Sequence, residues 1–125
     1  VDKQLFAKRK NIGEPIIARN FMSLGRPQEW KGTQVLLKAF KKVVKLYPDA
    51  TLTLYGSSDF DIPRDLQTNV KLMMGLSDDA LSKLYRSSDL VINPSYYESS
   101  PGPVLEALSV GTPLISTPIG NLITI

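Results

Sequence analysis

Two glutamates with possible roles in binding or catalysis, Glu98 and Glu106, are separated by seven residues in NPSYYESSPGPVLEALSVGTPLIS, residues 93–116. Glu106 has apolar neighbours on nearly every side, so its carboxylate is expected to be partly buried. A buried carboxylate needs hydrogen-bond donors or must be protonated. The two hydroxyls of a ribose are suitable donors, and a backbone amide or an ion pair with a lysine would satisfy the carboxylate equally well. The residues around Glu106 leave these alternatives open.

A candidate anion site lies in the octapeptide GRPQEWKG, residues 25–32, where Arg26 and Lys31 precede an expected helix. Unpaired amides and the positive end of the dipole attract anions to a helix amino terminus, and two cations would strengthen that attraction. Two solvated loop charges explain the octapeptide as well, and from these eight residues alone that explanation is favoured. The chain contains neither G-x-x-x-x-G-K-[ST] nor G-x-G-x-x-G, so the usual phosphate-loop and dinucleotide fingerprints are missing.

A second expected helix start lies between the two glutamates, at Gly102 and Pro103. Proline suits the first helical position because its missing N–H has no intrahelical partner there, which leaves the amides of Val104 and Leu105 free to meet a phosphate. The tripeptide DFD, residues 59–61, resembles a metal-diphosphate motif of another glycosyltransferase fold. Two aspartates in a polar loop are more often turn residues, so no metal site is expected.

Composition excludes several kinds of chemistry. The 125 residues include no cysteine and no histidine, which rules out the usual zinc sites and every histidine-based catalytic triad. The length suits one domain with its own core. A net charge of +3 and a pI near 9.2 fit phosphorylated ligands, nucleic acid or an anionic membrane surface equally well. No apolar run approaches the roughly 20 residues that a transmembrane helix needs.

The candidate residues must be positioned by strands and helices that alternate along the chain. Strands are expected at residues 16–24, 51–55, 70–74, 90–93 and 113–116, and helices at 33–47, 78–88 and 102–110. Residues 57–68 are expected to be a loop with one helical turn around Asp65. This alternation predicts the α/β class, with a Rossmann-like, doubly wound parallel sheet.

Ligands of such sheets bind outside the carboxyl ends of the strands. That rule selects four loops on one rim, at residues 25–32, 56–61, 75–77 and 94–102. Residues 1–15 are polar and are expected to lead into the first strand. The chain starts at Val1 rather than Met, and we expect residues 16–125 to be a domain cut from a longer protein.

The combined features resemble the carboxyl-terminal, donor-binding domain of a GT-B fold retaining glycosyltransferase of group 1, also called family 4. The resemblance covers nearly the whole chain and rests on GRPQEWKG, the LLKAF helix, YPDATLTLYG, NVKLMMGLSDDALSKLYRSSDLVINPS and YYESSPGPVLEALSVGTPLIS. Its most specific part is the pair of glutamates with seven residues between them, followed by EALSVGTPLI. Ser99 and Ser100 depart from the family pattern, which commonly has Gly and an aromatic or small residue there.

The resemblance implies a role for each candidate residue. Glu106 would bind the ribose of a sugar nucleotide, Glu98 would face the donor sugar near the reacting centre, and Arg26 and Lys31 would hold the diphosphate. The base would contact the backbone of the loop at residues 75–77. The remaining expected donor-binding residues are Gly25, Gly75, Leu76, Gly102, Val104 and Leu105.

The resemblance also implies an activity. The full-length enzyme would move a sugar from a UDP, GDP or ADP sugar to an acceptor hydroxyl, with retention at the anomeric carbon and without a metal or another cofactor. The expected setting is surface polysaccharide or glycolipid synthesis, in the cytoplasm or peripherally at the inner face of the membrane, with no nucleic acid partner. The acceptor would bind to an amino-terminal domain outside these residues, so the fragment is expected to be inactive alone.

Two other functions compete with this interpretation. Sugar-nucleotide 2-epimerases share the two-domain architecture, but they resemble the chain less and usually employ histidine, which is missing here. A doubly wound signalling or binding module would have an acidic cluster after the first strand, where this chain has Arg26 and Lys31. Nucleotide binding distinguishes a glycosyltransferase from such a binding module, whereas a 2-epimerase also takes a sugar nucleotide and is disfavoured by the missing histidine.

Overall fold

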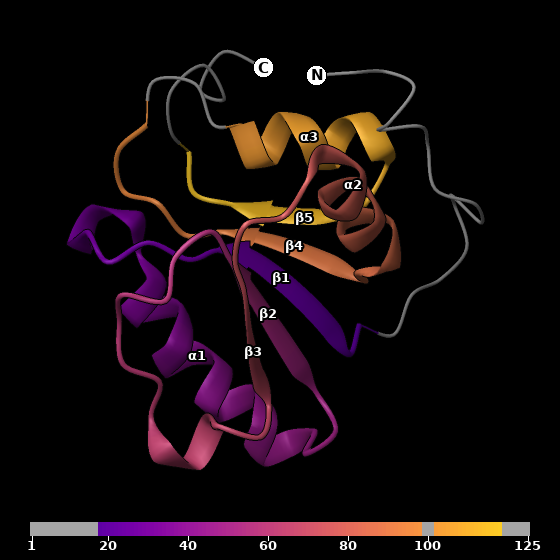
Figure 1. The fold of residues 1–125 in the computed structure, drawn as a ribbon. Helices are drawn as coiled ribbons and strands as arrows, with labels where there is room; N and C mark the ends of the chain where they lie inside the picture. Colours follow the sequence, from indigo (N-terminus) through magenta and orange to yellow (C-terminus); the bar gives the residue numbers. More distant parts are fainter. Residues whose placement is uncertain (1–17, 99–101, 119–125) are drawn as a thin grey trace.

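A five-stranded parallel sheet forms the middle layer of the computed structural model, which describes residues 18–98 and 102–118 (Figure 1). The strands run in the order β3-β2-β1-β4-β5, and every neighbouring pair is parallel. They are β1 (Asn20–Leu24), β2 (Thr51–Tyr55), β3 (Val70–Met73), β4 (Leu90–Asn93) and β5 (Leu114–Ser116). The expected lead-in at residues 1–15, the first two residues of the expected first strand, Ser99 and Ser100 lie outside the described residues.

Helices cover both faces of the sheet (Figure 1). The long helix α1 (Thr33–Leu46) lies on one face, and α2 (Asp78–Ser87) and α3 (Gly102–Val110) lie together on the other. Two short 3₁₀ turns complete the described part, η1 (Glu29–Lys31) and η2 (Arg64–Leu66). None of the helices within residues 18–98 and 102–118 is long and apolar enough to cross a bilayer. The expected α/β, Rossmann-like class is confirmed.

Alternation along each strand divides the core into two clusters. In β2, Leu52 and Leu54 are fully buried against α1, whereas Tyr55 packs with α2 and α3 on the opposite face. In β4, Val91 joins the second cluster and Ile92 packs against the first. A strand buried on both faces needs apolar residues at successive positions, which explains the near-continuous apolar runs in the sequence. Full burial of each large side chain contributes about 1.5–3 kcal/mol.

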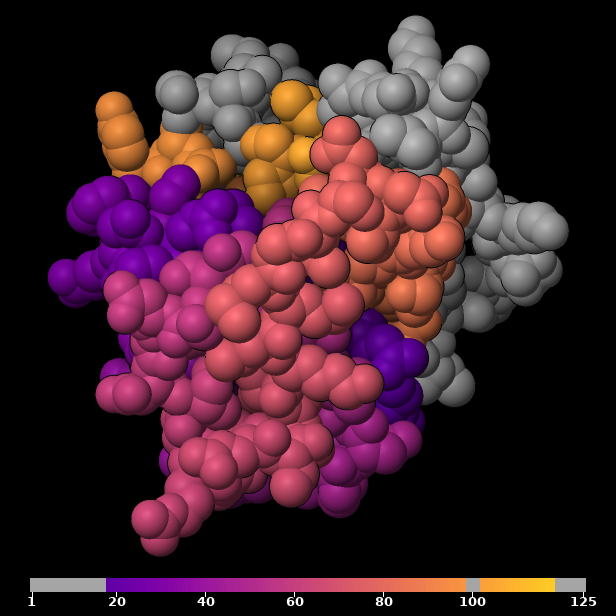
Figure 2. Space-filling view, viewed as in Figure 1, coloured from indigo at the N-terminus to yellow at the C-terminus, as the bar shows by residue number. Residues whose placement is uncertain are grey.

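The edge strand β3 is less covered than the sequence suggested. Only Val70 of its four residues is buried, and the space-filling view shows this strand and the segments beside it at the surface (Figure 2). Its partner β2 pairs with it from Leu52↔Val70 to Tyr55↔Met73. An outer strand needs apolar packing on fewer sides, so the sheet tolerates exposed positions there.

Element ends follow the sequence with small shifts. The first strand begins at Asn20 rather than within an apolar run, because pairing with β2 starts at Asn20↔Thr51. Just before it, the Arg19 guanidinium stacks over the Tyr47 ring at 4.1 Å. The predicted turn around Asp65 is confirmed as η2, whereas η1 was not predicted. The start of α2 is capped as expected, since Ser77 Oγ accepts from the Ala80 amide at 3.2 Å.

The strand order reverses between β1 and β4. From β1 the chain moves outward through α1 to β2 and β3, and then crosses back over α2 to β4 on the other side of β1. The loops that leave β1 and β4 therefore diverge to opposite faces of the sheet and leave a crevice at their start. This is the position at which doubly wound sheets bind ligands.

Candidate functional site

The candidate residues gather at the carboxyl ends of the strands. Gly25 follows β1, Gly56 follows β2, and Gly75 lies two residues beyond Met73, the last residue of β3. Register keeps these ends level, because Leu24 is paired with Tyr55 and Tyr55 with Met73. The structure therefore places the expected loops on one rim, as the sequence predicted.

Two of these loops, residues 25–32 and 94–98, are joined directly across the β1/β4 crevice. The Tyr96 amide donates to the Trp30 carbonyl oxygen at 2.6 Å. Gly32 has φ 75° and packs so closely on Pro94 that an added Cβ would lie 2.2 Å from the Pro94 carbonyl oxygen. Only glycine fits such a backbone approach without displacement. These contacts hold the two loops together at the switch point.

Lys31 and Glu98 form an ion pair across the same junction. Both side chains are largely buried, with exposed fractions of 22% and 12%. A pair so shielded from water is stronger than one on the surface, and removing either partner leaves an uncompensated charge. The lysine ion pair that the sequence left open for Glu106 is thus found at Glu98. Lys31 and Glu98, which with Arg26 are the three expected catalytic residues, therefore neutralise each other's charge in this arrangement.

Arg26 lies at the end of β1 and extends over the end of β2. Its backbone amide donates to Thr33 Oγ1 at 3.2 Å, and its Nη1 donates to the Gly25 carbonyl oxygen at 3.3 Å. The guanidinium packs on Gly56, since a Cβ there would lie 2.3 Å from Arg26 Nη1. The backbone of β2 therefore supports the cation, and its position depends on the absence of a side chain at residue 56.

Glu106 points back toward the amino terminus of α3. Its Oε1 lies 3.9 Å from the position that a Cβ on Gly102 would take, and the residue is half-buried. Within residues 18–98 and 102–118 it has no ion-pair partner, but it hydrogen bonds with Tyr85. Burial raises the pKa of the Glu106 carboxyl above its ordinary value, the Tyr85 hydrogen bond opposes that rise, and Asp78 adds to it.

The Tyr55 hydroxyl interacts with Tyr85 and with the charges of several candidate residues. Its hydroxyl lies 2.8 Å from that of Tyr85, and burial raises its pKa far above the ordinary value. The Tyr85 hydrogen bond and the Arg26 charge oppose that rise, whereas the charges of Glu106 and Glu98 add to it. Three of the residues selected from the sequence therefore lie within electrostatic reach of one hydroxyl. The charges of Arg26, Glu98 and Glu106 thus all act on a hydroxyl at the end of β2.

The amino terminus of α3 supplies backbone donors on the same rim. The helix begins at Gly102, and the first four amides of an α-helix have no intrahelical acceptor. Val104 is buried and Leu105 half-buried, so only their backbone is suited to ligand contact. Across the rim Gly75 has open space around it, and Leu76 packs its side chain against the second core cluster.

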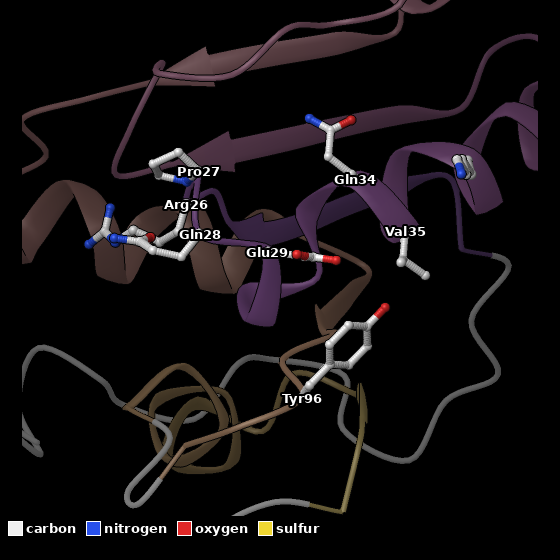
Figure 3. Close-up of a pocket in the computed structure, with 8 residues that line it drawn as sticks. Arg26, Pro27, Gln28, Glu29, Gln34, Val35 and Tyr96 are labelled. Atoms are coloured by element: carbon white, nitrogen blue, oxygen red, sulfur yellow. The ribbon is translucent and has the colours of Figure 1, made fainter.

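A cavity of about 260 Å³ lies beside this rim, between the start of α1 and the loop after β4 (Figure 3). Figure 3 shows the Tyr96 ring directed toward Glu29 and Val35, with the Arg26 side chain extending away from it. Arg26 is the one residue of the expected donor site that lines this cavity. The cavity is therefore a neighbour of the candidate site and does not contain Glu98 or Glu106.

The DFD loop has the turn structure that the sequence favoured. The Asp59 amide donates to Ser57 Oγ at 3.1 Å, and Phe60 packs over Gly25, where a Cβ would lie 2.8 Å from its ring. The described residues contain no group of three or more acidic side chains suited to hold a metal ion.

Sequence reasoning missed Tyr55, Tyr85 and Gly56. The two tyrosines occupy apolar positions of a strand and a helix, so their pattern indicates core packing and conceals their hydroxyls. Gly56 was predicted to end a strand and to begin the rim loop at residues 56–61, but its role as a support for Arg26 was not predicted. A buried hydroxyl needs a partner, and that requirement was the signal available for the tyrosines.

Comparisons with known proteins agree with this architecture. Residues 18–125 match the family described as glycosyl transferases group 1. A D-inositol 3-phosphate glycosyltransferase of Corynebacterium kroppenstedtii is 33% identical over 135 residues, covering 97% of this chain and 30% of that protein. The chain thus spans about a third of the length of the curated relatives it matches.

Solved structures show the same fold. The carboxyl-terminal domain of a group 1 family glycosyl transferase, LpcC from Francisella tularensis, matches with a TM-score of 0.70 at 25% identity, covering 94% of this chain and 70% of that chain. Anabaena HepE, solved in complex with UDP-glucose, matches with a TM-score of 0.67 at 22% identity, covering 86% of this chain and 32% of that chain. The family match spans every described element of the sheet and its helices. The chain belongs to the group 1 glycosyltransferases.

Proposed function

We propose that this chain is the donor-binding part of a retaining glycosyltransferase that moves a sugar from a nucleoside diphosphate to an acceptor hydroxyl. The observation that carries the proposal is the Lys31–Glu98 ion pair, which joins the loops after β1 and β4 at the switch point of the sheet. Family membership favours an enzyme over a non-catalytic binding module.

Each part of a nucleoside diphosphate has a chemically suited partner on the rim. The Glu106 carboxylate accepts hydrogen bonds from the ribose hydroxyls. Arg26, Lys31 and the amides in the first turn of α3 hold the diphosphate, because cations and a helix amino terminus both attract anions. The open backbone around Gly75 receives the base. HepE, which has the same fold, was solved with UDP-glucose and supports a sugar nucleotide as the donor class.

In the proposed reaction, the bond between the anomeric carbon and the diphosphate oxygen breaks, and the bonding electrons stay on the diphosphate. Arg26, Lys31 and the helix amides stabilise the charge that develops there. The acceptor hydroxyl attacks the anomeric carbon from the same face, so the configuration is retained. Its proton passes to the departing diphosphate oxygen, which supplies the base that a chain without histidine lacks. No metal ion or further cofactor is invoked.

The Lys31–Glu98 pair adds a step to donor binding. Before the donor arrives, the charge of Lys31 is compensated by Glu98. A diphosphate that enters the rim competes with Glu98 for the Lys31 ammonium, and the Glu98 carboxylate is then directed at the hydroxyls of the donor sugar.

We assign this activity to the synthesis of a surface polysaccharide or a glycolipid in the cytoplasm, at the membrane's inner face.

Nucleotide titration into the full-length protein tests the proposal. UDP, GDP, ADP and their sugars are titrated into wild type, Glu106→Ala and the control Glu29→Ala, which removes an exposed carboxylate from the neighbouring loop. We expect Glu106→Ala to weaken binding of the preferred nucleotide about 10-fold or more and Glu29→Ala to leave it unchanged. Failure of wild type to bind any nucleoside diphosphate, or unchanged binding by Glu106→Ala, contradicts the proposal.

The same titration has a pH dependence with a defined sign. Burial holds the pKa of Glu106 above its ordinary value of 4.5, and the protonated carboxyl is a poorer acceptor for ribose hydroxyls. Affinity should therefore be constant near neutral pH and fall as the pH is lowered through the raised pKa. This component should vanish in Glu106→Ala.

A further inference from the structure

The carboxylate of Glu106 interacts with a hydroxyl in the protein core, that of Tyr85. Glu106 lies in the second turn of α3 and reaches back to the start of the helix, where its Oε1 lies 3.9 Å from the Cβ position of Gly102. Tyr85 of α2 has no exposed surface, and its hydroxyl reaches the same first turn of α3, where it donates to the Pro103 carbonyl oxygen and its hydrogen bond with Glu106 opposes the rise in the pKa of that carboxyl. A carboxylate that is hydrogen bonded on its core side has its remaining lone pairs available on the side that faces the rim.

The Tyr85 hydroxyl has further partners that fix its position. It lies 2.8 Å from the Tyr55 hydroxyl and 3.4 Å from the Pro103 carbonyl oxygen in the first turn of α3. Each hydroxyl carries one proton and two lone pairs. If Tyr55 donates to Tyr85, the single Tyr85 proton is directed at the start of α3, where the Pro103 carbonyl oxygen and the Glu106 carboxylate both accept from it, and the two tyrosines form a chain from β2 through α2 to α3.

Core packing alone does not explain these two hydroxyls. The rings of Tyr55 and Tyr85 meet edge to face with centroids 6.2 Å apart, and two phenylalanines would make the same contact. Burying each hydroxyl instead carries a desolvation cost unless it is hydrogen bonded. Burial raises the pKa of both tyrosines, so both hydroxyls keep their protons and remain donors. The acceptor on the ligand side of this chain is Glu106.

We propose that Tyr85 is a positioning residue, whose hydroxyl, supported by Tyr55, orients the Glu106 carboxylate for the two hydroxyls of a ribose. The inference rests on the proposed function and adds a group that no ligand touches. A residue with this role should affect recognition of the ribose far more than recognition of the diphosphate or base. The distinguishing quantity is the ratio of the Kd for a 2′-deoxynucleoside diphosphate to that for its ribose form.

The test uses the full-length protein, with UDP and 2′-deoxy-UDP as the probes, and with the GDP and ADP pairs if these bind more tightly. We expect wild type to have a ratio of about 10 or more, since it loses a hydrogen bond to a charged group with the deoxy probe. Tyr85→Phe should weaken binding of the ribose form several-fold, leave the deoxy form nearly unchanged, and bring the ratio close to 1.

A matched control separates orientation from general packing. Thr112 Oγ1 donates to the Tyr85 carbonyl oxygen at 2.7 Å, so Thr112→Val removes a buried hydrogen bond from the same residue without touching its hydroxyl. We expect Thr112→Val to lower the thermal unfolding midpoint and to keep the wild-type ratio. Tyr55→Phe, which removes the support of Tyr85, should give an intermediate ratio.

The outcomes distinguish this inference from the function on which it rests. An unchanged ratio in Glu106→Ala contradicts the ribose role of Glu106 itself. A reduced ratio in Glu106→Ala with a wild-type ratio in folded Tyr85→Phe overturns only the positioning role. If Tyr85→Phe does not fold, Tyr55→Phe decides, and a wild-type ratio there overturns the inference. In the Glu106→Ala background, Tyr85→Phe should produce no further loss of affinity.

Discussion

At the scale of single residues, the ion pair between Lys31 and Glu98 bears directly on the proposed binding of a donor. The two side chains come from loops 67 residues apart in sequence and are both largely buried. A carboxylate that neutralises the lysine lowers the attraction of this rim for a free diphosphate. The same carboxylate is the one expected to contact the donor sugar. Affinity for the nucleotide and catalysis of transfer should therefore respond in opposite directions when Glu98 loses its charge.

We predict that Glu98→Gln in the full-length protein tightens binding of the free nucleoside diphosphate by about 3- to 10-fold, because Lys31 becomes available to the phosphate. It should also lower kcat for sugar transfer by about 100-fold or more, because a group that stabilises the reacting centre is lost. Calorimetry gives the first quantity and steady-state kinetics the second. Glu29→Gln, which changes the net charge equally on the loop that carries Lys31, serves as the control. Weaker nucleotide binding by Glu98→Gln refutes this account of the pair.

At the scale of elements, the site depends on contacts between the loops after β1 and β4. The structure joins these loops through the backbone bond of Trp30 to Tyr96, the close approach of Gly32 to Pro94, and the Lys31–Glu98 pair. The first two contacts involve backbone atoms, which cannot move without shifting α1 or β4. The loops should therefore behave as one unit.

Gly32→Ala tests this unit. The new Cβ would stand 2.2 Å from the Pro94 carbonyl oxygen at a residue with φ 75°, so both strain and collision oppose it. We expect a loss of at least about 2 kcal/mol in the free energy of unfolding and a marked loss of nucleotide affinity. Gly111 directly follows α3 and also has a positive φ (84°). Gly111→Ala therefore supplies the backbone strain without disturbing the joined loops. Denaturant unfolding measures the change in the free energy of unfolding, and calorimetry measures the change in nucleotide affinity. Equal losses of nucleotide affinity in Gly32→Ala and Gly111→Ala would argue against a joined pair of loops.

At the scale of the whole molecule, the sequence predicted the class, the order of elements and the rim, because strand and helix periodicities are local signals. It also selected Arg26, Glu98 and Glu106, whose charges all act on the Tyr55 hydroxyl, while their roles toward a donor stay predictions. Pairings between distant residues could not be predicted in this way. Lys31 meets Glu98 and Tyr55 meets Tyr85 only because the sheet order places β1 between β2 and β4. The start of β1 was misjudged, because pairing with β2, not hydrophobicity, decides where this strand begins.

The length of the chain leads to a prediction about activity. It spans about a third of its curated relatives, and the proposed acceptor site lies in the remainder. We expect the 125-residue chain to fold, to bind the preferred nucleoside diphosphate more weakly than the full-length protein, and to transfer no sugar. Release of free nucleoside diphosphate from the donor, with and without acceptors, measures transfer, and the full-length protein is the positive control. Detectable transfer by the isolated chain would disprove the two-part arrangement.

The joined loops also contain an optical reporter. Trp30 is the single tryptophan of the 125 residues, it is half-exposed, and its carbonyl oxygen is bonded to the Tyr96 amide. Indole emission depends on the polarity of its surroundings, and no second indole in this chain dilutes the signal. Excitation of Trp30 therefore reports on the junction beside Lys31 alone. Arrival of a phosphate, or separation of the two loops, becomes visible as a change in fluorescence without any label attached to the protein.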